Sequence, residues 1–448
     1  MIIQTARIRE GRVTFVQFTR QHKSIWLNIL IASIAAFGVA CTTETDSDVV
    51  DTATVPSATA SSTVATSTST GRGTADTLDA PSTNLTDSCI EQGEFHADLD
   101  YFPDKVLVRT AENFVIEYHN SYKILTINGT DSTDTRSYTL VQCGADAPTD
   151  LEHPIINIPI RSMFLSSSTQ YPGITILGSK DVVTGVAQTG YITSTELMAH
   201  VIENNVTEFA ANFEVDTEAV IAEKPEVLLS SGFPDPSYSV LRDLEIPVID
   251  WTDWLETNPI GRAEWMYVTA ALLNREKIAT AFIDEVEKEY GRLSAMASER
   301  SDRPKVMVGS AFQGTFYAPG GGSYVAQLVD DAGGDYIWRT GEDTGSLYLD
   351  IETVLVEGQT ASIWIDAPSH WINLKQGLIE DPRYADLNSI QMEQVWNHTR
   401  LVNKNGADDY FERAASRPDL LLADLMKIFH PEIMSHHSLE WYLRLPPQ

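Results

Sequence analysis

Basic residues are scarce in this sequence. The chain of 448 residues contains 31 Lys and Arg against 63 Asp and Glu, which gives a formal net charge of −32. Nucleic-acid binding depends on Lys and Arg that displace the counterions of the phosphates. The charge balance therefore excludes DNA and RNA as partners, whereas it favours solubility. With 43% hydrophobic residues, the chain can nevertheless bury a sizeable core.

Motifs of catalysis are also lacking. The sequence has no G-x-S-x-G elbow, no H-E-x-x-H zinc helix and no G-x-G-x-x-G fingerprint. Residues 173–180 approach a phosphate-binding loop, but Ser179 and Lys180 stand in inverted order. His430, His436 and His437 have no matching His and carboxylate group earlier in the chain, so we interpret them as a surface cluster. We expect a protein that is not an enzyme, with no cofactor and no direct metal ligand.

Cysteine is rare, and its three positions differ in context. Cys41 follows a basic segment and an uncharged, mostly apolar stretch, Ser24–Ala40, which together are typical of a lipoprotein signal. We expect lipidation at Cys41 and export of the rest; a non-cleaved anchor helix is the alternative. Cys89 and Cys143 would then lie outside the cytoplasm, where a disulfide between them can form. Two buried free thiols remain the other interpretation.

Composition and hydrophobic periodicity divide the chain into five parts. Residues 1–41 form the signal peptide, and 42–93, rich in Ser and Thr, form a flexible tether. Residues 94–260 form an N-terminal α/β lobe with a β-rich extension, in which runs such as Ile174–Leu177 are predicted strands. Residues 261–302 form a long interlobe helix with a break at Asn274, and 303–448 form a C-terminal α/β lobe. The alternation of strands and helices predicts a central, largely parallel sheet in each lobe.

A set of short motifs carries a family resemblance. They occur in a fixed order from about Ile155 to the C-terminus: Ile246–Trp251, Trp254–Glu256, Pro259–Trp265, Gly320–Tyr324, Ala332–Tyr336, Asn403 with Asn405, Asp408–Tyr410, Arg417–Leu425 and His430–Glu432. Together they resemble the periplasmic substrate-binding proteins of iron-complex and cobalamin ABC importers. The resemblance implies two α/β lobes joined by a helical connection, with a ligand held in the cleft between them. The β-rich segment before Ile155 lies outside it.

The resemblance also implies the partners. In that family a glutamate on each lobe docks arginines of the permease dimer, which works with its ATPase. Two similar segments, Asp216–Val220 and Asp350–Leu355, place such a residue at Glu218 and at Glu352. The alternative is two solvated helix carboxylates. We expect a monomer attached to the membrane by its lipid, which delivers a small iron complex to the importer.

Candidate ligand-binding residues are aromatic, cationic and hydroxyl side chains near strand ends and loops. Arg262 would pair with the negative charge of a ferric chelate. The full set is Ser167, Ser168, Thr169, Trp251, Arg262 and Trp265 in the first lobe, and Phe316, Tyr317, Ser323, Tyr324, Trp371, Asn405 and Tyr410 in the second. For each aromatic residue the alternative is core packing. Cobalamin receptors tend to place aromatics in the turns before Glu218 and Glu352, and the turns Ala211–Phe213 and Gly345–Leu347 give that ligand poor support. Haem lacks an obvious set of His or Tyr ligands, so we expect an iron-siderophore-like ligand. A surface lipoprotein that keeps the fold but has no transport role is a further alternative.

Overall fold

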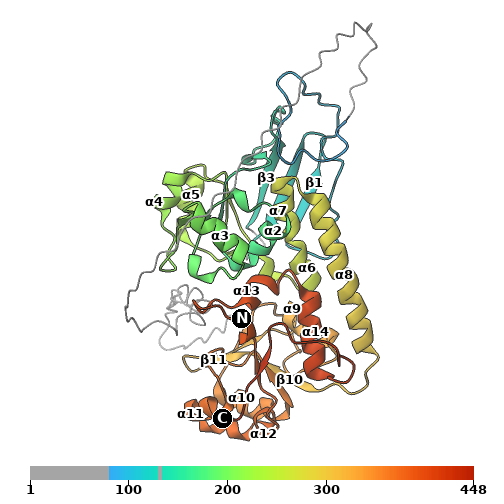
Figure 1. The fold of residues 1–448 in the computed structure, drawn as a ribbon, viewed down its shortest axis with the longest axis vertical. Helices are drawn as coiled ribbons and strands as arrows, with labels where there is room; N and C mark the ends of the chain where they lie inside the picture. The colour runs from blue at the N-terminus through green and yellow to red at the C-terminus, as the bar shows by residue number, and fades with distance from the viewer. Residues whose placement is uncertain (1–79, 130–133) are drawn as a thin grey trace, which may run out of the picture.

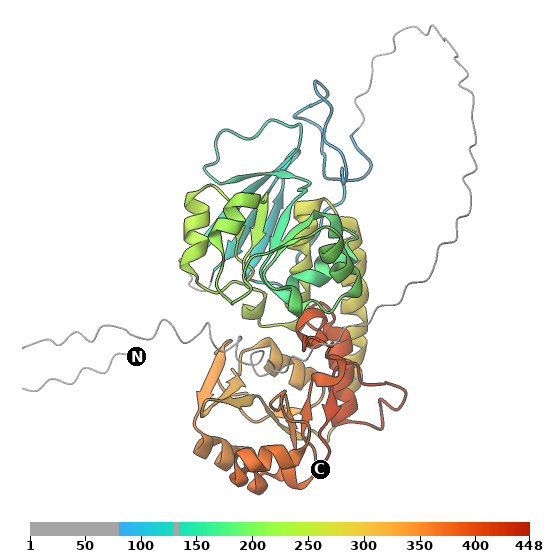
Figure 2. The same cartoon turned by 60° about the vertical axis from the view of Figure 1, so that its left-hand side comes forward.

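The computed structural model describes residues 80–129 and 134–448. The predicted signal peptide, Cys41 and most of the predicted tether lie outside these ranges. Two lobes lie one above the other, with a long helix beside both (Figures 1 and 2). Within the described ranges, no helix combines the length and the apolar character needed to cross a membrane.

The β-rich extension is a four-stranded sheet on top of the first lobe (Figure 1). Strands β1 (Phe114–Tyr118), β2 (Tyr122–Asn128) and β3 (Thr135–Gln142) are antiparallel, and β4 (Ile155–Ile158) runs parallel to β3. Alternating burial along β2 shows why it forms a strand: every second side chain enters the core of the lobe.

The first lobe contains a parallel sheet, as the sequence predicts, with five strands in the order β7-β6-β5-β8-β9. Its short strands are β5 (Met163–Leu165), β6 (Val183–Val186), β7 (Thr207–Glu208), β8 (Val227–Leu229) and β9 (Val248–Ile249). The helices around it are α2 (Tyr171–Ile176), α3 (Thr195–Glu203), α4 (Thr217–Glu223) and α5 (Pro236–Asp243).

The strand predicted over Ile174–Leu177 is wrong, because these residues form helix α2 and its C-cap. A capping box on the preceding turn, with Ser167 and Gln170 bonded to each other's backbone, starts the helical path, and Pro172 lies in the first turn of α2. Gly178, with φ of 64°, lies just beyond the end of the helix. An apolar run of this length does not by itself distinguish a buried helix from a strand.

Residues 80–93, predicted to belong to the tether, pack against the first lobe instead. Cys89 is joined to Cys143 by a disulfide, the pairing expected from the sequence. Asn84 is buried, and its side-chain amide donates to the Asp104 carbonyl (2.7 Å) and to the Glu276 carboxylate (2.9 Å). The disulfide and these hydrogen bonds to distant residues therefore order a segment whose polar composition is typical of a flexible linker.

Three successive helices connect the lobes: α6 (Pro259–Glu264), α7 (Met266–Leu273) and α8 (Glu276–Ser298). The predicted break at Asn274 is present, in left-handed conformation with φ of 56°. Helix α8 is about 35 Å long at ~1.5 Å per residue. Its N-terminal half contributes Ala279 and Ile283 to the core of the first lobe, and its C-terminal half contributes Val286, Tyr290 and other residues to the core of the second.

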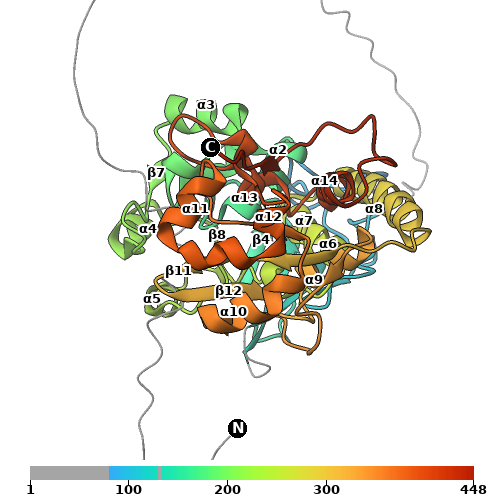
Figure 3. The same cartoon turned by 90° about the horizontal axis from the view of Figure 1, so that it is seen from below.

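The second lobe has a parallel sheet in the order β13-β10-β15, formed by β10 (Lys305–Val308), β13 (Asp335–Tyr336) and β15 (Ile363–Ile365). An antiparallel sheet that sequence analysis missed lies beside it, with β11 (Ser310–Phe312), β12 (Thr315–Pro319) and β14 (Ser346–Leu349). The helices are α9 (Tyr324–Asp331), α10 (Ile351–Glu357), α11 (Leu374–Glu380), α12 (Asn388–Gln391), α13 (Asp409–Arg413) and α14 (Pro418–Phe429). A short ribbon of β16 (Trp396–Asn397) and β17 (Leu443–Arg444) completes it, and Figure 3 shows α10, α11 and α12 from below.

Two buried carboxylates, Glu264 on α6 and Glu256 just before it, attach the extension to the start of the helical connection. Glu264 accepts the backbone N–H groups of Arg109, Thr110 and Ala111 (2.7–3.0 Å), and Glu256 accepts those of Glu112 and Asn113 (2.9 and 3.1 Å). Both are about 1% exposed. Gly261 allows this approach, since a Cβ there would lie 3.1 Å from the Ala111 backbone. The backbone N–H groups of residues 109–113 thus all have acceptors, which these two carboxylates provide.

A buried ion pair makes a second attachment. Lys123 on β2 contacts Glu276 at the start of α8, with both side chains fully buried. The ammonium also donates to the Ala271 carbonyl and to the Asn274 side chain, both at 2.8 Å. Burial lowers the pKa of Lys123, and Glu276 opposes that shift. All three donors of the ammonium are therefore used.

We predict that Lys123→Met lowers the free energy of unfolding by about 3–5 kcal/mol, because it leaves the Glu276 charge buried without its partner. Lys105→Met is the matched control: its ion pair with Asp100 is half exposed and contributes less than about 1 kcal/mol. Urea unfolding followed by Trp fluorescence measures both. Equal losses in the two variants would contradict an anchoring role for Lys123.

Candidate ligand-binding cleft between the lobes

A small pocket lies at the junction of the lobes, beside the C-terminal ends of the first lobe's parallel strands. This is where α/β sheets generally present their ligand sites. From the first lobe come Thr169, just after β5, and Trp251 and Asp253, just after β9. Helix α6 and its C-cap add Arg262 and Trp265, and Ala415 and Ser416 close the pocket from the second lobe.

Arg262 is the central charged group of this pocket. Its Nε donates to the Asp253 carboxylate at 2.9 Å, and its guanidinium lies over the ring of Tyr324 at 4.5 Å. Burial raises the pKa of Asp253, and the Arg262 charge opposes this. Tyr324 belongs to the second lobe, so Arg262 links the two lobes through a cation–π contact.

The pocket also contains an unsatisfied donor. The indole Nε1 of Trp251 is buried and makes no hydrogen bond. A buried donor without a partner costs free energy, and it is relieved when a water or ligand acceptor enters. The ring of Trp251 packs against that of Trp265 at an angle of 59°, with ring centroids 5.1 Å apart.

A polar cluster from the second lobe lies next to Tyr324. Tyr410 stacks on His398 with centroids 4.3 Å apart, and His398 Nδ1 lies 2.7 Å from Asp408. Burial lowers the pKa of His398, but the hydrogen bond and charge of Asp408 outweigh it, so the pKa is raised overall. Tyr442 donates to Asp366 at 2.7 Å, just after β15. Burial raises the pKa of Tyr410 well above its usual value, so its hydroxyl stays protonated.

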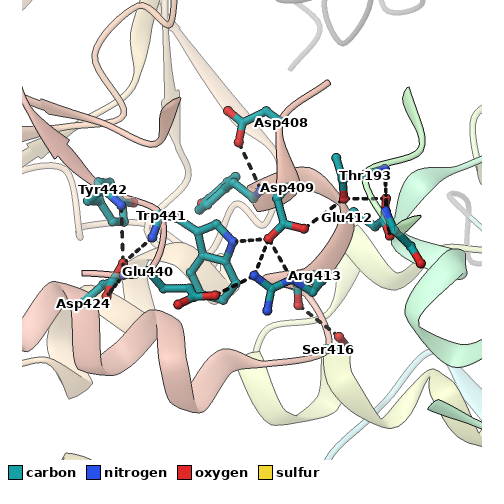
Figure 4. Close-up of polar contacts among 12 residues, drawn as sticks. Thr193, Asp408, Asp409, Glu412, Arg413, Ser416, Asp424, Glu440, Trp441 and Tyr442 are labelled. Atoms are coloured by element: carbon teal, nitrogen blue, oxygen red, sulfur yellow. Dashed lines mark hydrogen bonds and ion pairs between the residues drawn. The ribbon is translucent and has the colours of Figure 1, made fainter. Parts of the chain in front are cut away.

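The lobes are joined by a second set of contacts, the interlobe latch, which consists of Thr193, Ser194, Asp409 and Glu412 (Figure 4). Glu412 on α13 accepts the Thr193 N–H (2.5 Å), the Thr193 hydroxyl (2.7 Å) and the Ser194 N–H (3.1 Å). Asp409 lies 2.9 Å from the Thr193 hydroxyl. Because Ser194 is the N-cap of α3, the Glu412 charge also faces the positive end of that helix.

The latch is supported from behind by the C-terminal segment (Figure 4). Asp409 accepts the Trp441 indole N–H (2.9 Å) and Arg413 Nε (2.7 Å). Asp424 on α14 in turn accepts the backbone N–H groups of Glu440 and Trp441 at 2.8–3.0 Å. The carboxylate that faces Thr193 is therefore held in a fixed orientation.

Seven of the predicted ligand residues lie at the junction. Thr169, Trp251, Arg262 and Trp265 line the pocket, Tyr324 contacts Arg262, and Tyr410 belongs to the neighbouring cluster. Ser168 donates across the junction to the Phe411 carbonyl at 3.0 Å. Trp265 has a structural role as well, because it is 1% exposed and its indole N–H donates to Glu256.

The other predicted residues are not brought into the pocket. Phe316 and Trp371 are 1% exposed in the core of the second lobe, so their prediction as ligand contacts is wrong. Ser323 is the buried N-cap of α9, and Ser167 caps the turn before α2. Tyr317 packs edge to face with Tyr348, and Asn405 lies exposed in a turn bonded to Asn403.

Several residues of the junction were missed. Asp253, His398, Asp366 and Glu412 make its main polar contacts, and nothing in the spacing of the sequence sets them apart from the many other acidic residues. The three C-terminal histidines do not form one surface cluster either. His430 is 1% exposed, His437 pairs with Asp424 at 2.7 Å, and only His436 is exposed.

The predicted docking residues occupy matching positions. Glu218 and Glu352 each lie in the first turn of a seven-residue helix, α4 or α10, behind an Asp N-cap, and both are exposed. Glu352 forms an exposed ion pair with Arg383 at 3.0 Å. Such a pair is worth about 0–1 kcal/mol, so the carboxylate can exchange partners.

Comparison with known proteins agrees with this architecture. A family model described as periplasmic binding protein matches residues 176–398. An uncharacterized lipoprotein of Methanocaldococcus jannaschii is 23% identical over 303 residues, 65% of this chain and 70% of the relative. A periplasmic binding protein from Veillonella parvula superposes with a TM-score of 0.52 at 13% identity, over 69% of this chain and 99% of that one. Residues 176–398 thus match the periplasmic binding protein family, and the two parallel-sheet lobes with their helical connection have the fold of such a protein.

Proposed function

We propose that the protein is the substrate-binding receptor of an ABC importer, exported and anchored by lipid at Cys41, which captures an iron-siderophore-like complex between its lobes. The observation that carries the proposal is Arg262, a cation at the junction that is only 15% exposed and contacts groups of both lobes. A ferric chelate with net negative charge can replace Tyr324 or Asp253 as its partner. The nearby hydroxyls of Tyr324 and Tyr410 and the free Trp251 indole N–H supply donors for its oxygen atoms.

The closed arrangement requires an opening step. The pocket is a cavity of about 10 Å³, room for about one water molecule. Small-molecule sites usually measure ~300–1,000 Å³, and a siderophore complex is a large ligand. The lobes must therefore part before binding, and the latch opposes this. The small pocket also favours the second candidate function, a surface lipoprotein that keeps the fold without transport.

We predict that a ferric siderophore quenches Trp fluorescence of the full-length protein with a submicromolar midpoint. Arg262→Ala leaves Asp253 without its partner, so Arg262→Gln combined with Asp253→Asn serves as the better-folded variant. Both should weaken binding at least ~10-fold, since hydrogen bonds to charged groups are worth about 1.5–3 kcal/mol. Arg292→Ala, an exposed arginine on α8, is the control. If ferric chelates, haem and cobalamin all leave the fluorescence unchanged, the transport proposal is contradicted and a lipoprotein without a transport role is favoured.

We predict that Glu218→Ala and Glu352→Ala leave ligand binding unchanged but lower uptake of radiolabelled ferric complex at least ~10-fold. Each variant removes one rim charge that orients the loaded receptor on the permease. Glu223→Ala, an exposed glutamate on the same helix as Glu218, is the matched control. Uptake that responds equally to all three variants would contradict specific docking.

We predict that Glu412→Ala speeds association with the ligand by shifting the lobes toward an open state. The variant removes the acceptor of three latch hydrogen bonds, each worth about 1.5–3 kcal/mol when charge-assisted. Stopped-flow fluorescence gives the association rate, and small-angle X-ray scattering gives the radius of gyration. Glu196→Gln, an exposed carboxylate on α3, should change neither. An unaltered rate and radius in Glu412→Ala would show that the latch does not limit opening.

A further inference from the structure

A second polar site lies outside the cleft, where the chain enters the second lobe. Helix α8 ends at Ser298, and the following loop carries Asp302. Helix α14 ends at Phe429 and is followed by His430 and Glu432. One ligand atom from each of Asp302, His430 and Glu432 lies within 4.8 Å of the other two. Residues far apart in the sequence thus bring an imidazole and two carboxylates together.

The imidazole of His430 is fixed and has a free nitrogen. Its Nε2 lies 3.1 Å from the Gly333 carbonyl oxygen, which only accepts, so Nε2 carries the hydrogen. Gly333 has φ of 79°, and a Cβ there would lie 2.7 Å from Nε2. Only a glycine at position 333 leaves room for this ring. The side chain is 1% exposed, and Nδ1 makes no hydrogen bond.

The free Nδ1 faces a carboxylate. Asp302 Oδ2 lies 4.0 Å from it, too far for a hydrogen bond. When Nδ1 carries no hydrogen, its lone pair and the carboxylate oxygen that faces it repel. A cation between them removes that repulsion.

Arg300 supplies part of the required positive charge. Its Nη2 lies 2.9 Å from Asp302 and 3.0 Å from Glu432, so the guanidinium gathers both carboxylates. The Nε of Arg300 is buried without a partner. The two carboxylates are 65% and 54% exposed. They can rotate toward an incoming ion, whereas the imidazole is already in place.

We propose that Asp302, His430 and Glu432 bind a divalent transition-metal ion of the Zn²⁺ class. Zn²⁺ takes imidazole nitrogen and carboxylate oxygen ligands, commonly with water in a further position. The hard ions Mg²⁺ and Ca²⁺ prefer all-oxygen sites. The hydrogen bond from His430 Nε2 to a backbone carbonyl is the outer contact that metal-bound histidines typically make. The ion would tie the entry of the second lobe to the end of α14, independently of the cleft.

The test is a Zn²⁺ titration of the full-length protein after removal of metals with EDTA. Calorimetry should give one Zn²⁺ per chain, and Zn²⁺ should raise the Tm, because a ligand that binds only the folded state stabilises it. Asp302→Asn combined with Glu432→Gln should weaken binding at least ~10-fold and abolish the rise in Tm. These positions are exposed, so the variant folds, as circular dichroism will verify.

Two further variants make the result decisive. His436→Ala removes an exposed histidine of the same region and should leave Zn²⁺ binding unchanged. His430→Gln keeps a donor for the Gly333 carbonyl but lacks the metal-binding nitrogen, and should bind as weakly as the double variant. The proposal is overturned if the unaltered protein binds no Zn²⁺, if the double variant binds it equally well, or if His436→Ala removes binding.

Discussion

The architecture depends on hydrogen bonds from five successive backbone N–H groups, residues 109–113, to two buried carboxylates, Glu264 and Glu256. Ionised carboxylates are costly to bury unless their oxygens are satisfied. Here the cost is offset by donors that would otherwise be orphaned themselves. These hydrogen bonds join the β-rich extension to the start of the helical connection. The ion pair of Lys123 and Glu276 makes a second attachment, at the start of α8. The extension is therefore part of the first lobe rather than an appendage.

The helical connection determines how the lobes move. Because α8 contributes to both cores, a large hinge rotation would pull Ile283 or Val286 out of a packed interior, at about 1.5–3 kcal/mol for each buried side chain. A small opening costs mainly polar contacts, those of the latch and of Arg262. Both of these contacts link the lobes by charged groups, which water and a polar ligand can also satisfy. Opening is thus limited in range but reversible.

The sequence predicted those parts of the fold that depend on residues close together in the chain. The alternation of strands and helices, the break at Asn274, the similarity of the segments around Glu218 and Glu352 and the pairing of Cys89 with Cys143 all appear in the structure. The site was harder to predict, because Trp371 in the core and Trp251 in the pocket look alike in sequence. The contact of Glu412 with Thr193 joins residues 219 positions apart, and no local pattern encodes it. Hydrogen bonding also orders residues 80–93 against their composition.

Helix α8 also constrains where the sequence can gain or lose residues. Since its two halves belong to different cores, the number of residues between Ile283 and Val286 sets the angle between the two lobes about the helix axis. One inserted residue would turn the second lobe by about 100° relative to the first, since a turn takes ~3.6 residues. Arg262 would then no longer face Tyr324, nor Glu412 face Thr193. Substitutions along the exposed side of α8 are tolerable, but insertions and deletions are not, so the length of this helix fixes how the two lobes are aligned.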